Sequence, residues 1–226
     1  MNSQRLKLFA LFCMTIDHFG VVLNTLHRYN IAGSDFAFYM TDAYWQMRVI
    51  GRLAFPIFCF LIAEGCAHSK NIKKYIGRLA IFAIISQIPY QVFWNISSSG
   101  TDNITKDFFV YTQGNVLVTL SLGAIAAYFY SKIFGKRKMY YKMLYASGIA
   151  ASFVAVVLLR GEYDLVGILI ILLVYAFRLK DASDLDFKVF GTKHIQVLCC
   201  ALVTFGYYAL MIHRSHYEVI GAVSSI

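Results

Sequence analysis

Apolar stretches of about 20 residues recur along the chain and alternate with short segments that carry most of its charges. A helix of about 20 apolar residues crosses the roughly 30 Å hydrocarbon core of a bilayer. Charged residues make up 15% of the sequence, against about 25% in a soluble domain, which excludes a water-soluble globule. The sequence therefore predicts an all-α, polytopic transmembrane helical bundle. Its candidate spans are residues 6–26, 47–67, 75–95, 113–131, 140–159, 162–178 and 193–212.

The two ends of the chain add to this prediction of about seven spans. Residues 218–226 are apolar but too short to cross a bilayer, so they are expected to be a possible truncated eighth span. The first span contains two ionisable residues and no small-residue cleavage site follows it, so we expect a retained helix and not a signal peptide. No repeat or low-complexity linker interrupts the sequence, and one transmembrane domain is expected over residues 1–226.

The basic residues divide unevenly between the loops. Fifteen of the 21 Lys and Arg residues lie in the N-terminal segment and in the loops after the second, fourth and sixth spans. Because cytoplasmic loops are enriched in these residues, the N-terminus is expected in the cytoplasm and the C-terminus outside. The net charge of +9 is then explained by orientation and by contact with anionic membrane lipid, and no nucleic-acid partner is expected.

The cysteines give no sign of a metal centre. All five (Cys13, Cys59, Cys66, Cys199 and Cys200) lie within apolar spans, and none belongs to a CxxC or Cys/His pattern with ligand spacing. We expect reduced packing residues and no metal site.

Two ionisable residues, Asp17 and His18, lie deep in the first span. At 1.5 Å per residue they are about 17 Å from its cytoplasmic end, where a charged side chain costs roughly 2.5–3.5 kcal/mol. Such residues are functional candidates by default. Neighbours on a helix point about 100° apart, so the two are expected to take different partners. An Asp–Arg pair that only locks two helices together is the alternative for Asp17.

The second span carries Arg52 and Glu64, which are about 18 Å apart along a helix and cannot pair with each other. Arg52 lies at the level of Asp17, which predicts a buried Asp17–Arg52 pair. Glu64 lies at the level of Arg78, and that pair is expected to be mainly structural. Pro56 removes a backbone hydrogen bond between them and predicts a kink.

Further polar residues stand in or beside other spans. Gln87, Asn115 and the dipeptide Tyr163-Asp164 would line a polar cavity open to the outside if their faces converge, with Asp17, His18 and Arg52 at its floor. A satisfied hydrogen bond between helices is the alternative for each of them alone. On the cytoplasmic side, the cluster Lys70, Lys73, Lys74 and Arg78 could hold an anionic ligand such as the phosphates of coenzyme A. Orientation and lipid contact are the alternative there.

Several short motifs resemble one family of bacterial inner-membrane proteins, the TraX family. They are Thr15-Ile-Asp-His-Phe-Gly20, Gly51-Arg-Leu-Ala-Phe-Pro-Ile-Phe58, Ala63-Glu-Gly65, Arg78-Leu-Ala, Ile85-Ser-Gln-Ile-Pro89, Gly114-Asn-Val and Tyr163-Asp-Leu-Val-Gly167. The namesake of the family acetylates the N-terminus of conjugative pilin, and the family is similar to membrane acyltransferases that use cytosolic acetyl-CoA. Family members continue into a further helix with a Tyr-Pro-x-His-like element, which residues 1–226 do not contain.

The resemblance implies an integral-membrane acetyltransferase of the bacterial inner membrane. Acetyl-CoA would be the co-substrate, and the acceptor a pilin N-terminus, a glycan hydroxyl or amine, or a lipid-linked sugar. His18 would be the general base or a transient acyl carrier, organised by Asp17 and Arg52. The expected acetyl-CoA-binding residues are Glu64, Lys70, Lys74, Arg78, Gln87 and Asn115.

Two other classes of protein remain open from the residues alone. One is a small proton-coupled transporter in which Asp17, His18 and Arg52 form a relay. The sequence lacks the internal duplication of many such carriers. The other is a non-catalytic pilus-assembly protein, in which the buried charges only pack helices. Binding of acetyl-CoA separates the acetyltransferase from both.

Overall fold

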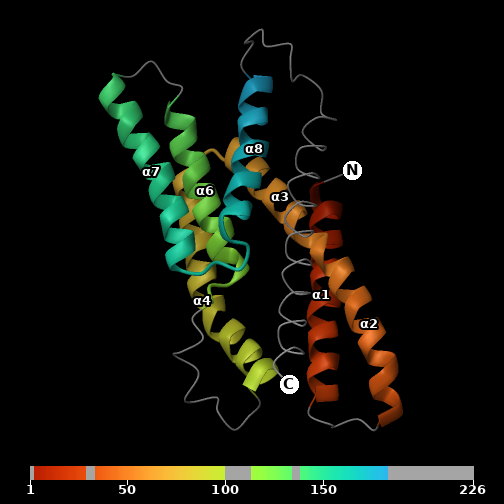
Figure 1. The fold of residues 1–226 in the computed structure, drawn as a ribbon. Helices are drawn as coiled ribbons and strands as arrows, with labels where there is room; N and C mark the ends of the chain where they lie inside the picture. Colours follow the sequence, from red (N-terminus) through yellow and green to blue (C-terminus); the bar gives the residue numbers. More distant parts are fainter. Residues whose placement is uncertain (1–2, 29–33, 100–112, 134–137, 183–226) are drawn as a thin grey trace, which may run out of the picture.

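The computed structural model describes residues 3–28, 34–99, 113–133 and 138–182, which form a bundle of α-helices (Figure 1). The predicted all-α class is confirmed for this part of the chain. Its helices are α1 (Ser3–Arg28), α2 (Ser34–Arg52), α3 (Ala54–His68), α4 (Ile72–Ser99), α6 (Val116–Ile133), α7 (Met139–Leu158) and α8 (Asp164–Ala182).

Five segments within the described residues are long and apolar enough to cross a membrane, and they match the first five predicted spans. They are Gln4–Leu26, Ala43–His68, Ile72–Asn95, Val116–Ile133 and Met139–Leu158. The chain is thus a multi-pass membrane protein. The predicted span 162–178 is helical, as α8, but charged residues near both of its ends keep it out of this set. The predicted spans 193–212 and 218–226 lie outside the described residues.

Large apolar side chains cover the outside of the bundle. On α4, Ile81, Phe82, Ile84, Ile85 and Ile88 are 57–73% exposed. In water such a face would need a protein partner, whereas in a bilayer it is covered by lipid tails. The exposure is therefore what a membrane-embedded helix requires.

The core lies between α3, α6 and α8, which pack against one another. Its centre contains small side chains at the contact points, with Cys59, Ala63, Ala124 and Ala127 fully buried beside Ile171. Small residues let helix backbones approach closely, which is the main source of helix association in lipid. This tight core fixes α8, and with it the connection between α7 and α8.

Three of the cysteines belong to the described residues. Cys13, Cys59 and Cys66 are buried free thiols, as expected for packing residues. Cys199 and Cys200 lie outside the described part of the chain.

A break separates α2 from α3 within the second predicted span. The two helices meet at Leu53, whose N–H donates to the Ile50 carbonyl at 3.1 Å. Pro56 has no N–H to give to the Arg52 carbonyl four residues earlier, and its ring crowds that carbonyl. The predicted kink is confirmed, and it falls directly after Arg52.

The outer ends of α6, α7 and α8 meet part-way along α1, not at its end (Figure 1). Gly114, just before α6, and Gly161, between α7 and α8, form a short parallel bridge. The Gly114 N–H donates to the carbonyls of Leu159 and Arg160, at 3.2 and 3.0 Å. This bridge places the connection between α7 and α8 at the depth of the middle of α1.

The orientation of the bundle can be tested with single cysteines in a background that lacks the five native ones. Lys70→Cys, in the exposed turn between α3 and α4, is expected to resist a membrane-impermeant thiol reagent in intact cells and to react in inverted vesicles. Thr101→Cys, in the segment after α4, should show the opposite pattern. Labelling of Lys70→Cys in intact cells would reverse the predicted topology.

Candidate functional site

The site begins at a close contact between α1 and α2. A Cβ on Gly20 would lie 2.9 Å from the Met47 Cβ, and a Cβ on Gly51 would overlap the Asp17 side chain. Gly20 and Gly51 are one pair of small positions that bring the two backbones together. The result is that Asp17 points at α2 and not at lipid.

Asp17 forms an ion pair with Arg48. The Arg48 Nη1 donates to Asp17 Oδ2 at 2.6 Å, and the two side chains are 15% and 18% exposed. The predicted pairing of Asp17 with Arg52 is therefore wrong in its partner. Arg48 and Arg52 are four residues apart and so lie on the same face of α2, and the packing of Gly51 on Asp17 brings Arg48 into contact.

Arg52 is nevertheless part of the same group of charges. Its guanidinium acts on the Asp17 carboxylate second only to Arg48. It stands at the last position of α2, immediately before the break at Leu53. The prediction that Arg52 lies near Asp17 is confirmed in this weaker sense.

His18 is exposed beside this pair and takes a different partner, as expected. Its Nδ1 is 2.8 Å from the Met14 carbonyl of its own helix. A carbonyl only accepts, so in this bond Nδ1 carries the proton and Nε2 keeps its lone pair. The imidazole also lies against Phe93 of α4, with the ring centroids 5.7 Å apart. His18 is thus held by its helix with one basic nitrogen free of that bond.

Glu162 is a site residue that sequence reasoning missed. It lies in the connection between α7 and α8, and the charges acting on its carboxyl are, from the strongest, those of Arg52, His18, Arg48 and Asp17. Burial raises the pKa of Glu162 above its ordinary value of 4.5, and the three cations oppose that rise. The only sequence signal was its position directly before the Tyr163-Asp164 motif.

The motif itself does something other than predicted. Tyr163 is 8% exposed and stacks on Phe55 of α3, with ring centroids 3.5 Å apart and planes at 6°. Asp164 is exposed at the first position of α8. Neither side chain therefore lines a cavity with Asp17, and the motif instead fixes the loop that carries Glu162.

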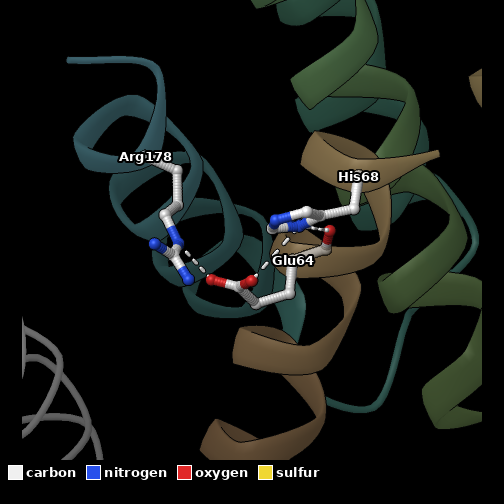
Figure 2. A network of polar contacts seen from close by, with 3 residues as sticks. All are labelled: Glu64, His68 and Arg178. Carbon is white, nitrogen blue, oxygen red and sulfur yellow. Dashed lines mark hydrogen bonds and ion pairs between the residues drawn. The ribbon is translucent and has the colours of Figure 1, made fainter. Parts of the chain in front are cut away.

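A second polar group lies near the cytoplasmic ends of α3 and α8. Figure 2 shows Arg178 and His68 turned toward Glu64 from opposite sides. Arg178 Nε donates to Glu64 Oε1, and His68 Nδ1 lies 3.3 Å from Glu64 Oε2 and 3.0 Å from the Glu64 carbonyl. The predicted Glu64–Arg78 pair is wrong. Arg78 is exposed, and Glu64 ties α3 to α8 instead.

Gln87 and Asn115 bind each other and the backbone between α4 and α6. Gln87 Nε2 donates to the Gln113 carbonyl at 2.8 Å, and its Oε1 accepts from the Asn115 N–H at 3.0 Å. Asn115 Nδ2 donates to the Ala83 carbonyl and to Ser86 Oγ, at 2.8 and 3.1 Å. Both residues thus form the interhelical hydrogen bonds that were their alternative reading, with much of their bonding capacity used.

This arrangement predicts that Asn115 is structural. Asn115→Leu is expected to lower the free energy of unfolding by roughly 1–3 kcal/mol, because it leaves the buried partners of the amide unsatisfied. Chemical denaturation in detergent would measure the change. Ser86→Ala, which removes one of these bonds, should cost less than Asn115→Leu. An equal loss in both variants would contradict the clamp.

The remaining candidates are basic residues at the cytoplasmic end. Lys70, Lys74 and Arg78 are exposed. Beside them, the ammonium groups of Lys73 and Lys132 lie 5.9 and 5.5 Å from the centroid of the Tyr128 ring. Lysines of α4 and α6 thus meet on one ring, within the range of a cation–π contact. The result is a positively charged surface beside the turn between α3 and α4.

A comparison with protein families identifies the chain. The model of the family described as TraX protein matches residues 2–224. The chain belongs to the TraX family. It is also 34% identical, over 128 residues, to a protein of Dichelobacter nodosus named probable fimbrial assembly protein FimC, serogroup H1. That match covers 55% of the chain and 45% of the other protein, so it spans about half of each. No solved structure matches the chain.

In this TraX-family protein the polar residues fall into two groups at different depths. The outer group consists of Asp17, His18, Arg48, Arg52 and Glu162. The cytoplasmic group, around Glu64, is about 18 Å away along the α2–α3 segment. The sequence predicted three members of the outer group.

Proposed function

We propose that this TraX-family membrane protein is an acetyltransferase that moves an acetyl group from cytoplasmic acetyl-CoA to an acceptor on the outer side of the bacterial inner membrane. Family membership supports a protein of this kind, and one relative is named for fimbrial assembly. A pilin N-terminus is therefore the first acceptor to test, followed by glycan and lipid-linked sugar amines and hydroxyls.

The observation that carries the proposal is the state of His18. Its Nδ1–H is bound to the Met14 carbonyl, so the nitrogen that remains, Nε2, is an acceptor. An imidazole exchanges its proton near neutral pH and is the most common general base in enzymes. A neutral acceptor N–H or O–H could give its proton to Nε2 as it attacks.

The reaction balances with groups on the protein. The acceptor atom bonds to the thioester carbonyl carbon, its proton moves to His18 Nε2, and the carbon–sulfur bond breaks with its electron pair on sulfur. The proton then passes from His18 to the thiolate, which leaves as coenzyme A. Arg48 and Arg52 are the cations nearest the carboxylates of the site, and Arg52 is placed to stabilise the oxyanion that forms in the transition state.

On the cytoplasmic side we propose that Lys70, Lys74 and Arg78 hold the phosphates of acetyl-CoA. Their exposure leaves them accessible to a large anion. Glu64 was expected to contribute to the same site, but its carboxylate is engaged with Arg178 and His68. The proposed acetyl-CoA site therefore keeps the three cations and omits Glu64, Gln87 and Asn115.

The purified protein, incubated with [¹⁴C]acetyl-CoA and bacterial membrane extract, should transfer label to an acceptor that can be identified by mass spectrometry. A transporter would bind no acetyl-CoA and label nothing, and a purely structural assembly protein would do the same. Matched preparations of Lys70→Gln/Lys74→Gln should need more acetyl-CoA for half-maximal transfer. Absence of both binding and transfer would overturn the proposal.

A further inference from the structure

The loop that carries Glu162 is held in an unusual shape. Arg160 and Asp164, on either side of it, have φ angles of 48° and 42°, which side chains other than glycine rarely adopt. Such strain is stored where surrounding structure enforces it, and it occurs most often at functional sites. Gly161 sits against Thr119 and Val156, where a Cβ would lie 2.5 and 2.8 Å from their side-chain atoms.

The packing of this loop places Glu162 at the break between α2 and α3. Tyr163, the next residue, stacks on Phe55 in the first turn of α3. Phe55 follows Arg52 by three residues, so the two are about one helical turn apart. Glu162 therefore meets the end of α2 from the opposite side to Asp17, which packs on Gly51.

The charges around Glu162 are those of the proposed active site. α1 contributes Asp17 and His18, and α2 contributes Arg48 and Arg52. From α4, the contact described with His18 is the uncharged ring of Phe93. Two carboxylates and two guanidinium groups thus surround one imidazole, with Arg52 the cation that acts most strongly on Glu162.

We propose that Glu162 is a positioning residue for acetyl transfer, which orients Arg52 and stabilises the imidazolium of His18 after it has taken the proton of the acceptor. This inference rests on the proposed function. In many hydrolases a carboxylate does this through a hydrogen bond to the far nitrogen of the histidine. Here that nitrogen is bound to the Met14 carbonyl, so the carboxylate acts through its charge.

A purely structural role makes a different prediction. If Glu162 served only to pair Arg52, its removal would destabilise the fold. Because burial raises the pKa of Glu162, ionising it costs stability as pH rises from 4.5 towards that raised pKa. Glu162→Gln is therefore expected to melt at the same temperature as wild type, or higher, at pH 7.

The test uses diethyl pyrocarbonate, which reacts with a neutral imidazole nitrogen, on the full chain in detergent. The extent of modification of His18 is read by mass spectrometry and divided by that of His68, whose carboxylate neighbour is Glu64. At pH 6, Glu162→Gln is expected to raise this ratio about two- to threefold, because less of His18 is held in the protonated form. At pH 8 the ratio should equal that of wild type.

Asp164→Asn is the matched control, since it removes an exposed carboxylate from the same loop and should leave the ratio unchanged at both pH values. A rise at both pH values would mean that the variant only opens access to His18, and no rise at pH 6 would mean that Glu162 does not act on it. Either result overturns the inference.

Kinetics separate this inference from the proposed function. If wild type transfers acetyl groups, Glu162→Gln should lower kcat at least about tenfold with an unchanged KM for acetyl-CoA, and Glu162→Asp should recover part of it. If wild type transfers nothing but the modification ratio changes as expected, the proposed function fails and the effect of Glu162 on His18 stands.

Discussion

Replacement of His18 by alanine is expected to reduce acetyl transfer at least about a hundredfold, because a general base contributes about 10²–10⁴-fold in rate. The folded state should hardly change. The described hydrogen bond of the imidazole is to the carbonyl of Met14 in its own helix, and hydrogen bonds of side chains in membranes contribute only about 0.6 kcal/mol on average. Radiolabelled acetyl transfer and acetyl-CoA binding, measured on the same preparation, test both statements.

His68→Ala is the matched control for this experiment. Its Nδ1 also lies within hydrogen-bond distance of the carbonyl four residues earlier, at 3.0 Å, compared with 2.8 Å for His18. Removal of His68 should therefore perturb its helix to the same degree and leave transfer near wild type. Near-normal transfer in His18→Ala would refute the assignment of the base, and loss of transfer in His68→Ala would move the chemistry to the cytoplasmic side. Loss of folded protein in His18→Ala would show a packing role.

Neutralising Asp17 or Arg48 alone is expected to destabilise the protein by about 3 kcal/mol, since each change leaves the other charge buried without its partner. The value lies at the low end for buried pairs because the two side chains are 18% and 15% exposed. Asp17→Asn combined with Arg48→Met should cost less than the sum of the two single changes. Chemical denaturation of the four proteins measures the coupling free energy.

A second cycle, with Arg52→Met in place of Arg48→Met, serves as the comparison. Arg52 acts on Asp17 without the 2.6 Å contact, so its coupling to Asp17 should be smaller. Equal coupling in the two cycles would mean that the pair changes partners in the folded protein. Additive effects of Asp17 and Arg48 would show that the ion pair contributes nothing to stability.

The spans were predictable because their signal is local. An apolar run of about 20 residues specifies a helix in a membrane whatever its neighbours are, and five such runs are present where the sequence placed them. The depth of Asp17 and His18 followed from counting residues along one helix. Pro56 likewise predicted a kink, since the bond it removes lies within its own helix.

The partners of these residues were not predictable for a physical reason. Arg48 and Arg52 lie one turn apart on the same face of α2, and the choice between them depends on a shift of a few ångströms between α1 and α2. Glu162 belongs to no periodic segment, and only the packing of Tyr163 on Phe55 brings it to the site. Interactions between helices of this kind leave no pattern in a single sequence.

The break at Leu53 also determines how water meets this protein. Backbone carbonyls that lack an internal donor are tolerated at membrane depth only when they are enclosed by protein or face water. Pro56 cannot donate to the Arg52 carbonyl, and the short helices α6, α7 and α8 stop near the same level. We therefore expect the bilayer to be locally thin on the outer side here, with a hydrated funnel leading down to the break. An acceptor would then approach from the aqueous phase and remain hydrated until it reaches His18, and the acetyl group would have only the cytoplasmic half of the bundle to cross.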